Sequence, residues 1–365
     1  MLNCGIVGLP NVGKSTLFNA ITSTQKAQSA NYPFCTIEPN KGIVDVPDKR
    51  LNVIANLSKS KAILPAKLEF VDIAGLVKGA HKGEGLGNQF LATIKEVDAI
   101  IHVLRCFDDN NIIHVEESVD PVRDAEIIDL ELIMADLESL EKRLSGLEKK
   151  AKIGNKEAKE QLNVIEKILP HLRNGKVVRK LQFTYEEKLV VKSLFLLTSK
   201  PVLYICNVKE DDIAQENNYV AKVKEMAQKE DSNYIMISAQ LEQEISSLAS
   251  LEEKQEYLNA LGLQDTGLDK IIRSAFDLLN LQTFFTAGPQ ETRAWTIKKG
   301  TKAPQGAGEI HSDFEKGFIC AETIAYEDFV KLGGEQKAKE MGKSRQEGKN
   351  YTILDGDIIL FRFNV

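Results

Sequence analysis

The sequence predicts an α/β protein with a mostly parallel sheet, an inserted pair of antiparallel helices and a small α+β domain at the C-terminal end. Three observations support this fold class. Short apolar runs alternate with polar or Gly-rich connectors over the first half of the chain, apolar residues recur at helical spacing in its middle, and Gly and Pro turns separate strand-like runs after about residue 281. A chain of 365 residues, 43% of them hydrophobic, is long enough for such an arrangement.

The strands of the first domain, residues 1–280, are expected where the apolar runs lie. Several runs are apolar throughout, as is typical of parallel strands whose sheet is covered by helices on both faces. Their ranges are residues 2–9, 42–46, 67–74, 99–106, 201–208 and 234–238. In the C-terminal domain, residues 281–365, the expected elements are strands at 295–297, 317–321 and 357–361 and a helix at 326–332.

The helical insertion is expected at about residues 124–199. Apolar residues recur there at spacings of three and four, with a break at Ile153-Gly154-Asn155. The repeat consists of Leu130, Ile133, Leu137, Leu140, Leu144, Leu147, Leu162, Ile165, Leu169 and Leu172. An antiparallel coiled-coil hairpin fits this pattern, and so does an ordinary helical pair on the sheet. The 12 Lys/Arg against 4 Asp/Glu of residues 142–180 favour an arm that projects into solvent.

The composition limits the cellular setting and the partners. No apolar run approaches the roughly 18 residues that a membrane-spanning helix needs, and the N-terminal residues lack the features of an export signal. The 5 cysteines are scattered, which fits a reducing compartment. A net charge of -6 argues against a protein that binds polyanions over its whole surface. We therefore expect a cytoplasmic protein, with neither a membrane nor DNA as partner.

The motif with the clearest chemistry lies near the N-terminus. Residues 8–15 read Gly-Leu-Pro-Asn-Val-Gly-Lys-Ser and fit G-x-x-x-x-G-K-[ST] between an apolar strand and a helix. In such a loop, backbone N–H groups face phosphate oxygens, Lys14 reaches the β- and γ-phosphates, and Ser15 holds Mg²⁺. We therefore predict a P-loop NTPase domain. Its expected nucleotide-binding residues are Asn11, Val12, Gly13, Lys14, Ser15 and Thr16.

Two further segments are expected to contact the γ-phosphate and its metal ion. Asp72 follows the third apolar strand and offers a carboxylate to Mg²⁺, while Gly75 lets a backbone N–H approach the γ-phosphate. Thr36, in the loop after the first helix, is a third candidate Mg²⁺ ligand. A lone threonine is also an ordinary turn residue. The predicted metal ligands are thus Ser15, Thr36 and Asp72.

Together these segments resemble the YchF family of Obg-like ATPases. The resemblance is carried by residues 8–16, 31–40, 70–80 and 207–210 and covers essentially the whole chain. It implies a translation-factor-type nucleotide domain, a coiled-coil insertion and a C-terminal TGS domain of β-grasp form. It also implies an ATPase that associates with the ribosome or its subunits. Ribosomal RNA is then the expected partner of the basic hairpin, residues 142–180, although a solvated helix face would account for the charge equally well.

The expected base-reading motif departs from that of most GTPases. Those proteins carry Asn-Lys-x-Asp, whose Asp accepts hydrogen bonds from the N1–H and amino groups of guanine. Residues 207–210 read Asn-Val-Lys-Glu, so this pairing is lost and ATP is favoured, with a GTPase of the same architecture as the alternative. The residues expected around the base are Asn207, Val208, Glu210, Ser238, Ala239 and Gln240.

Hydrolysis needs a group that orients water. Leu76 stands where many GTPases have a glutamine, and the resemblance assigns the role to His114, in the loop after the fourth strand. A solvated loop histidine is the competing interpretation, and His81 is a weaker candidate. The predicted catalytic set is His114, Lys14 and Gly75, with slow intrinsic turnover.

Two questions stay open at this point. Leu76 also suits a nucleotide-gated RNA- or protein-binding adaptor with negligible turnover, whereas a small-molecule kinase is disfavoured because no acceptor pocket is evident. Some relatives of the wider class use an asparagine at the position of Asn11 to bind K⁺ beside the phosphates. We therefore keep K⁺ as a second candidate cation after Mg²⁺.

Overall fold

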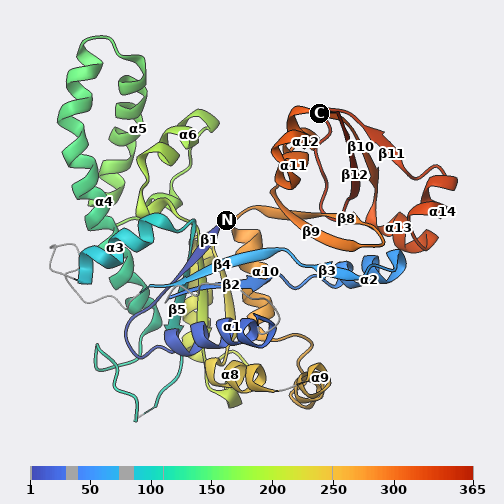
Figure 1. The fold of residues 1–365 in the computed structure, drawn as a ribbon. Helices are drawn as coiled ribbons and strands as arrows, with labels where there is room; N and C mark the ends of the chain where they lie inside the picture. The colour runs from blue at the N-terminus through green and yellow to red at the C-terminus, as the bar shows by residue number, and fades with distance from the viewer. Residues whose placement is uncertain (1, 30–39, 74–85, 110, 249, 365) are drawn as a thin grey trace. The chain divides into compact units, whose positions relative to one another are not determined.

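A computed structural model gives the fold and describes residues 2–29, 40–73, 86–109, 111–248 and 250–364 (Figure 1). The chain forms two compact units. The first comprises residues 1–42 and 69–271, and the second comprises residues 43–68 and 272–365. The second unit thus begins before residue 281 and includes an N-terminal segment, 43–68, that the sequence analysis assigned to the first domain.

The first unit contains a sheet with the strand order β2-β4-β1-β5-β6-β7. Strand β1 pairs in parallel with β4 and β5, and β6 pairs in parallel with β5 and β7. The strands are β1 (Asn3–Val7), β2 (Lys41–Asp45), β4 (Lys67–Asp72), β5 (Ala99–Arg105), β6 (Val202–Asn207) and β7 (Asn233–Ile237). The expected strands are therefore confirmed. Every residue of β5 is buried, which explains why this run is apolar with little alternation.

Helices flank this sheet and connect its strands. A connection between two parallel strands must cross from one end of the sheet to the other, and helices make most of these crossings. The helices of this unit are α1 (Lys14–Ser29), α3 (Leu86–Glu96), α4 (Pro121–Lys152), α5 (Lys156–Arg173), α6 (Tyr185–Leu194), α7 (Asn218–Lys229), α8 (Ala239–Ser247) and α9 (Leu251–Ala260). Helix α10 (Gly267–Leu278) includes residue 271, where the first unit ends. Within the described residues, none of the helices combines the length and the apolarity that crossing a membrane requires.

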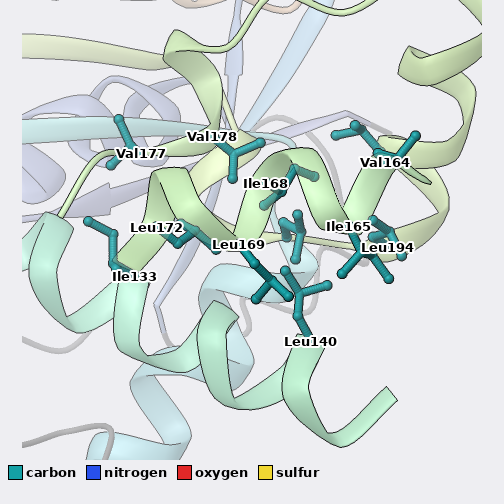
Figure 2. Close-up of a cluster of buried hydrophobic side chains, with 12 residues drawn as sticks. Ile133, Leu140, Val164, Ile165, Ile168, Leu169, Leu172, Val177, Val178 and Leu194 are labelled. Carbon is teal, nitrogen blue, oxygen red and sulfur yellow. The ribbon is translucent and has the colours of Figure 1, made fainter. Parts of the chain in front are cut away.

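Helices α4 and α5 form an antiparallel pair (Figure 1). Helix α4 begins where the carboxylate of Asp120 accepts hydrogen bonds from the N–H groups of Val122 and Arg123, and Asn155 caps α5 in the same way. Leucine, isoleucine and valine side chains from both helices and from the segment after α5 pack between them (Figure 2). The helical pair is confirmed, while its coiled-coil form stays a prediction.

One residue of the expected apolar seam lies outside it. Leu130 is 54% exposed. The first turns of α4 instead bury Ala125, Ile128 and Leu132, a different stripe of the helix. Helix α4 contacts β5 and α7 as well as α5, and the stripe that is buried changes along the helix.

The second unit is built on a sheet with the strand order β11-β10-β12-β8-β9-β3. Its strands are β3 (Ala62–Leu64), β8 (Leu281–Ala287), β9 (Glu291–Lys298), β10 (Phe318–Ile324), β11 (Arg345–Glu347) and β12 (Ile358–Phe363). Its helices are α2 (Lys49–Ser58), α11 (Ala303–Ile310), α12 (Ser312–Lys316), α13 (Tyr326–Leu332) and α14 (Glu335–Glu340). The strands and helix expected in this region are confirmed. Strand β3 joins the sheet by pairing in parallel with β9.

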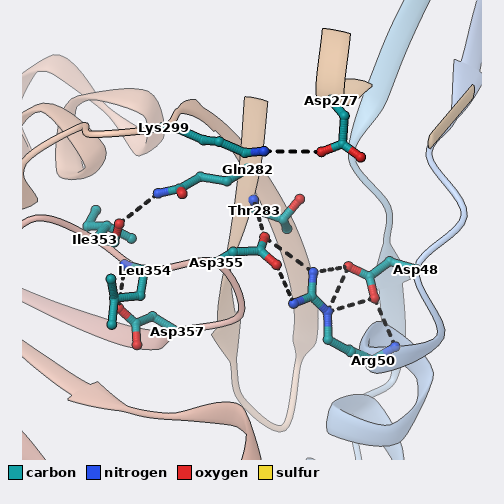
Figure 3. Close-up of polar contacts among 10 residues, drawn as sticks. All are labelled: Asp48, Arg50, Asp277, Gln282, Thr283, Lys299, Ile353, Leu354, Asp355 and Asp357. Carbon is teal, nitrogen blue, oxygen red and sulfur yellow. Dashed lines mark hydrogen bonds and ion pairs between the residues drawn. The ribbon is translucent and has the colours of Figure 1, made fainter. Parts of the chain in front are cut away.

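An arginine ties the N-terminal segment to the C-terminal part of this second unit. Arg50 donates from Nε to Asp48 at 3.0 Å and from Nη1 to Asp355 at 2.7 Å (Figure 3). Asp355 also accepts from the N–H of Thr283 at 2.9 Å. Burial would raise the pKa of the Asp355 carboxyl, but the hydrogen bonds from Arg50 and Thr283 outweigh it and hold this pKa below its usual value.

Replacing Asp355 with Asn should lower the free energy of unfolding at pH 7 by about 1 kcal/mol, since the Asp355 side chain is half exposed. Because the folded pKa lies below the unfolded one, the contribution is present at neutral pH and is lost as the pH falls below about 4. Urea unfolding of both proteins at pH 7 and pH 3 measures this. Asp277→Asn, at an exposed pair with Lys299, is the control and should change little. An equal D355N effect at both pH values would contradict the prediction.

Candidate functional site

The P-loop forms a cradle between β1 and α1. Asn11 and Gly13 adopt left-handed backbone conformations, with φ of 64° and 94°. A Cβ on Gly13 would lie 2.3 Å from Nδ2 of Asn207, so only glycine fits here. The loop lines a cavity of about 570 Å³. The lining residues are Leu9, Pro10, Asn11, Gly13, Lys14, Ser15, Thr16, Asn40 and Asp72.

The predicted phosphate and metal ligands of the described chain meet in this cavity. Asp72 is the last residue of β4, and Ser15 lies at the start of α1. The ammonium group of Lys14 contacts the Asp72 carboxylate. The N–H of Asp72 donates to the carbonyl of Asn40 at 2.8 Å, which sets the end of β4. A hydroxyl and a carboxylate in one cavity are hard oxygen donors of the kind that Mg²⁺ prefers. Thr36, Gly75, Leu76 and His81 lie outside the described residues.

Asn207 joins two parts of the site. Its Nδ2 donates to the carbonyl of Val12 at 2.9 Å, and its Oδ1 accepts from the N–H of Ala239 at 2.9 Å. The side chain is buried, at 5% exposure. The amide therefore fixes the P-loop against the start of α8, a bracing role that the sequence analysis did not foresee beside the expected contact with the base.

The other residues expected at the base lie at the ends of β6 and β7. These strands are neighbours, and the N–H of Val208 donates to the carbonyl of Ile237 at 2.8 Å. Ser238 caps α8, Ala239 is buried and Gln240 is exposed. Glu210 is exposed at the start of a single 3-10 turn, Glu210–Asp212. The fold thus brings the two predicted base-reading segments to one edge of the sheet.

His114 is buried, so its interpretation as a solvated loop histidine is wrong. The residue is 7% exposed, and its Nε2 lies 2.8 Å from Oδ2 of Asp124. Its Nδ1 accepts a hydrogen bond from the N–H of Glu116 at 3.1 Å. A nitrogen that accepts carries no proton in the neutral ring, so the proton sits on Nε2 and is donated to Asp124.

Two sets of contacts that the sequence analysis did not predict hold the loop before His114. Arg105, at the end of β5, is 1% exposed and donates to the loop carbonyls of Phe107, Asp109 and Ile112 at 2.9 to 3.1 Å. Asn11 donates from Nδ2 to the carbonyl of Ile113 at 3.1 Å, so a residue of the P-loop cavity contacts the neighbour of His114. An arginine at the end of an apolar strand was the available signal for the first contact.

Replacing Asn207 with Asp should weaken nucleotide binding by about tenfold or more, because a carboxylate oxygen would replace the donor that faces the Val12 carbonyl. Titration with a fluorescent nucleotide measures the affinity. Asn233→Asp, the same change at an exposed position on β7, should bind like the unchanged protein. Unaltered affinity in N207D would show that the brace is dispensable.

Comparison with known proteins places the chain in a family. A family described as 50S ribosome-binding GTPase matches residues 3–137. The YchF-GTPase C-terminal family, described as a protein of unknown function (DUF933), matches residues 281–364.

Full-length relatives and a solved structure agree with these matches. A ribosome-binding ATPase YchF of Bacillus subtilis (strain 168) is 55% identical over 366 residues and 100% of both chains. The protein of that name from Escherichia coli O157:H7 is 54% identical over 99% of each chain. A structure described as the Schizosaccharomyces pombe YchF GTPase is 42% identical, covers 99% of this chain and 97% of its own, and superposes with a TM-score of 0.89. The chain therefore belongs to the YchF family, with a P-loop domain of the GTPase type and the C-terminal domain of that family.

Proposed function

We propose that this protein is a Mg²⁺-dependent ATPase that acts as a nucleotide switch and associates with the ribosome or its subunits. The observation that carries the proposal is the cavity in which the P-loop, Ser15 and Asp72 meet. The names of the full-length relatives, ribosome-binding ATPases, support the choice of nucleotide and partner. On this proposal the C-terminal domain is the TGS module of β-grasp form.

On this proposal, different residues of the cavity bind the phosphates and the metal ion. Lys14 is 9% exposed and contacts Asp72, so a bound triphosphate would draw its ammonium group toward the β- and γ-phosphates. Ser15, Asp72 and the predicted ligand Thr36 would hold Mg²⁺. When bound, Mg²⁺ neutralises the charge that develops on the phosphate oxygens. Asn11 has an amide oxygen for K⁺, the second candidate cation, because only its Nδ2 is used toward Ile113.

His114 is the proposed group that orients the attacking water. The loop that carries it is linked to the P-loop through Asn11, which supports a role near the phosphates. The buried position of the imidazole also gives weight to a second function, a nucleotide-gated adaptor with negligible turnover. Single-turnover kinetics with and without ribosomes distinguish the two.

The choice between ATP and GTP depends on the segment Asn207–Glu210. Asn207 braces the P-loop. At the position where most GTPases have the aspartate that pairs with guanine, this chain has Glu210, which is exposed in its turn. The relatives are named ATPases, whereas the fission yeast structure is described as a GTPase.

Competition between labelled ATP and unlabelled nucleotides in the presence of Mg²⁺ tests the proposal. ATP should compete about tenfold more strongly than GTP, because the site lacks the carboxylate that pairs with guanine. Removing Mg²⁺ with a chelator should weaken binding, as the phosphates then lose a shared cation. GTP that binds about tenfold more tightly than ATP would contradict the proposed base preference, and failure of both nucleotides to bind would contradict the whole function.

The basic hairpin is the proposed contact with ribosomal RNA. Lys149, Lys150 and Lys152 are exposed in the last turn of α4. Reversing all three to Glu should weaken co-sedimentation with ribosomes by about tenfold or more at low salt and flatten its salt dependence, since phosphate contacts release counterions. The control reverses three exposed lysines elsewhere, Lys222, Lys229 and Lys298. Equal losses in both triple variants would mean that total charge, and not the hairpin, determines binding.

A further inference from the structure

We propose that Asp124 is a positioning residue that holds His114 away from the attacking water, so that release of His114 from Asp124 must precede hydrolysis. The inference rests on the proposed role of His114. It follows from the hydrogen bonds of the imidazole, the fixed position of its partner and the exposure of the surrounding loop.

The imidazole has no nitrogen free for water in this arrangement. A neutral ring offers one acceptor and one donor. The acceptor, Nδ1, takes the N–H of Glu116 at 3.1 Å, and the donor, Nε2, faces Asp124 at 2.8 Å. In a catalytic Asp-His pair, the carboxylate takes one ring nitrogen and the other faces the nucleophile. Here a backbone N–H occupies that second nitrogen, so the geometry favours a holding contact over such a pair.

Asp124 is the fixed partner of the two. It is 1% exposed and lies in the first turns of α4, a 32-residue helix. Its second oxygen, Oδ1, accepts from Nη2 of Arg123 at 3.0 Å and from Nε at 3.3 Å. A carboxylate near a helix N-terminus is further stabilised by the helix dipole. Movement that separates the pair must therefore come from the loop of His114.

The loop buries a polar side chain and exposes two apolar ones, the reverse of what solvation favours. It buries the imidazole of His114 but leaves Ile113 81% exposed and Val115 53% exposed. Covering apolar surface is favourable, so a second arrangement that covers these side chains and frees the imidazole has a driving force. Glu117 nearby has a φ of 63°, and its N–H donates to the carbonyl of His114 at 3.1 Å. A non-glycine residue with this backbone stores strain beside the proposed movement.

The parts of the loop differ in how they are held. Arg105 fixes the carbonyls of Phe107, Asp109 and Ile112 through a buried guanidinium. The next residue, Ile113, is joined to Asn11 by one exposed hydrogen bond. Because Asn11 lines the nucleotide cavity, a change at the phosphates would reach residues 113–117 while the first half of the loop stays in place.

Replacement of Asp124 tests the inference with two independent readouts. At saturating ATP without ribosomes, D124A should raise the single-turnover hydrolysis rate by about fivefold or more, and H114A should abolish the gain in the D124A/H114A double variant. Carbethoxylation by diethyl pyrocarbonate, mapped by peptide, should label His114 about fivefold faster in D124A, because the ring becomes accessible. In the same samples, exposed His311 reports that the reagent is active and buried His102 reports that the domain is folded.

The control variant is Asp136→Asn, at another buried carboxylate of α4, which accepts from the N–H groups of Leu197 and Thr198. It should change neither readout. If His102 becomes labelled in D124A, the milder D124N is used and should give smaller changes in the same direction.

Each outcome decides a separate question. Slower hydrolysis with faster labelling of His114 would make Asp124 an orienting partner and overturn the inference, as would a D124A variant that leaves both readouts unchanged. Normal hydrolysis in H114A alone would remove His114 from the reaction. The labelling data would then still report whether Asp124 holds the ring.

Discussion

The P-loop depends on a contact that leaves no room for a side chain. Gly13 faces the amide of Asn207, and that amide bonds Val12 on one side and Ala239 on the other. The contact connects the first strand of the chain with the ends of β6 and β7, which follow about two hundred residues later in the sequence. Asn207 therefore links the P-loop to the predicted base-reading segments, and a change in either would disturb both.

Buried polar groups also hold the segments that follow β5 in place. Arg105 organises the first half of the loop and Asp124 holds its histidine, and both are almost completely buried. Leaving such groups without partners would cost more than the hydrogen bonds contribute, so these contacts define the arrangement of the loop. The same principle applies at Asp136, which accepts two backbone N–H groups and the hydroxyl of Thr198 and so fixes α4.

The sequence was a good guide wherever one local pattern determines the structure. The apolar runs predicted the parallel strands, and the P-loop motif predicted that Lys14 and Ser15 line a cavity, as they do together with Asp72. The YchF resemblance was confirmed by the full-length relatives. Partners distant in sequence were not predictable in this way. The burial of His114 depends on Asp124, the exposure of Leu130 depends on what α4 contacts, and β3 depends on a strand more than two hundred residues away.

The inclusion of residues 43–68 in the second unit affects how fragments of the chain behave. This segment leaves the first unit just after Asn40 and returns just before Asp72, and both of these residues line the P-loop cavity. The segment 43–68 is therefore joined to the first unit through the covalent chain at both of its ends. It also follows that cutting the polypeptide at residue 281 would strip the C-terminal piece of β3 and of the Arg50 contact with Asp355. A fragment that reproduces the second unit would have to include residues 43–68.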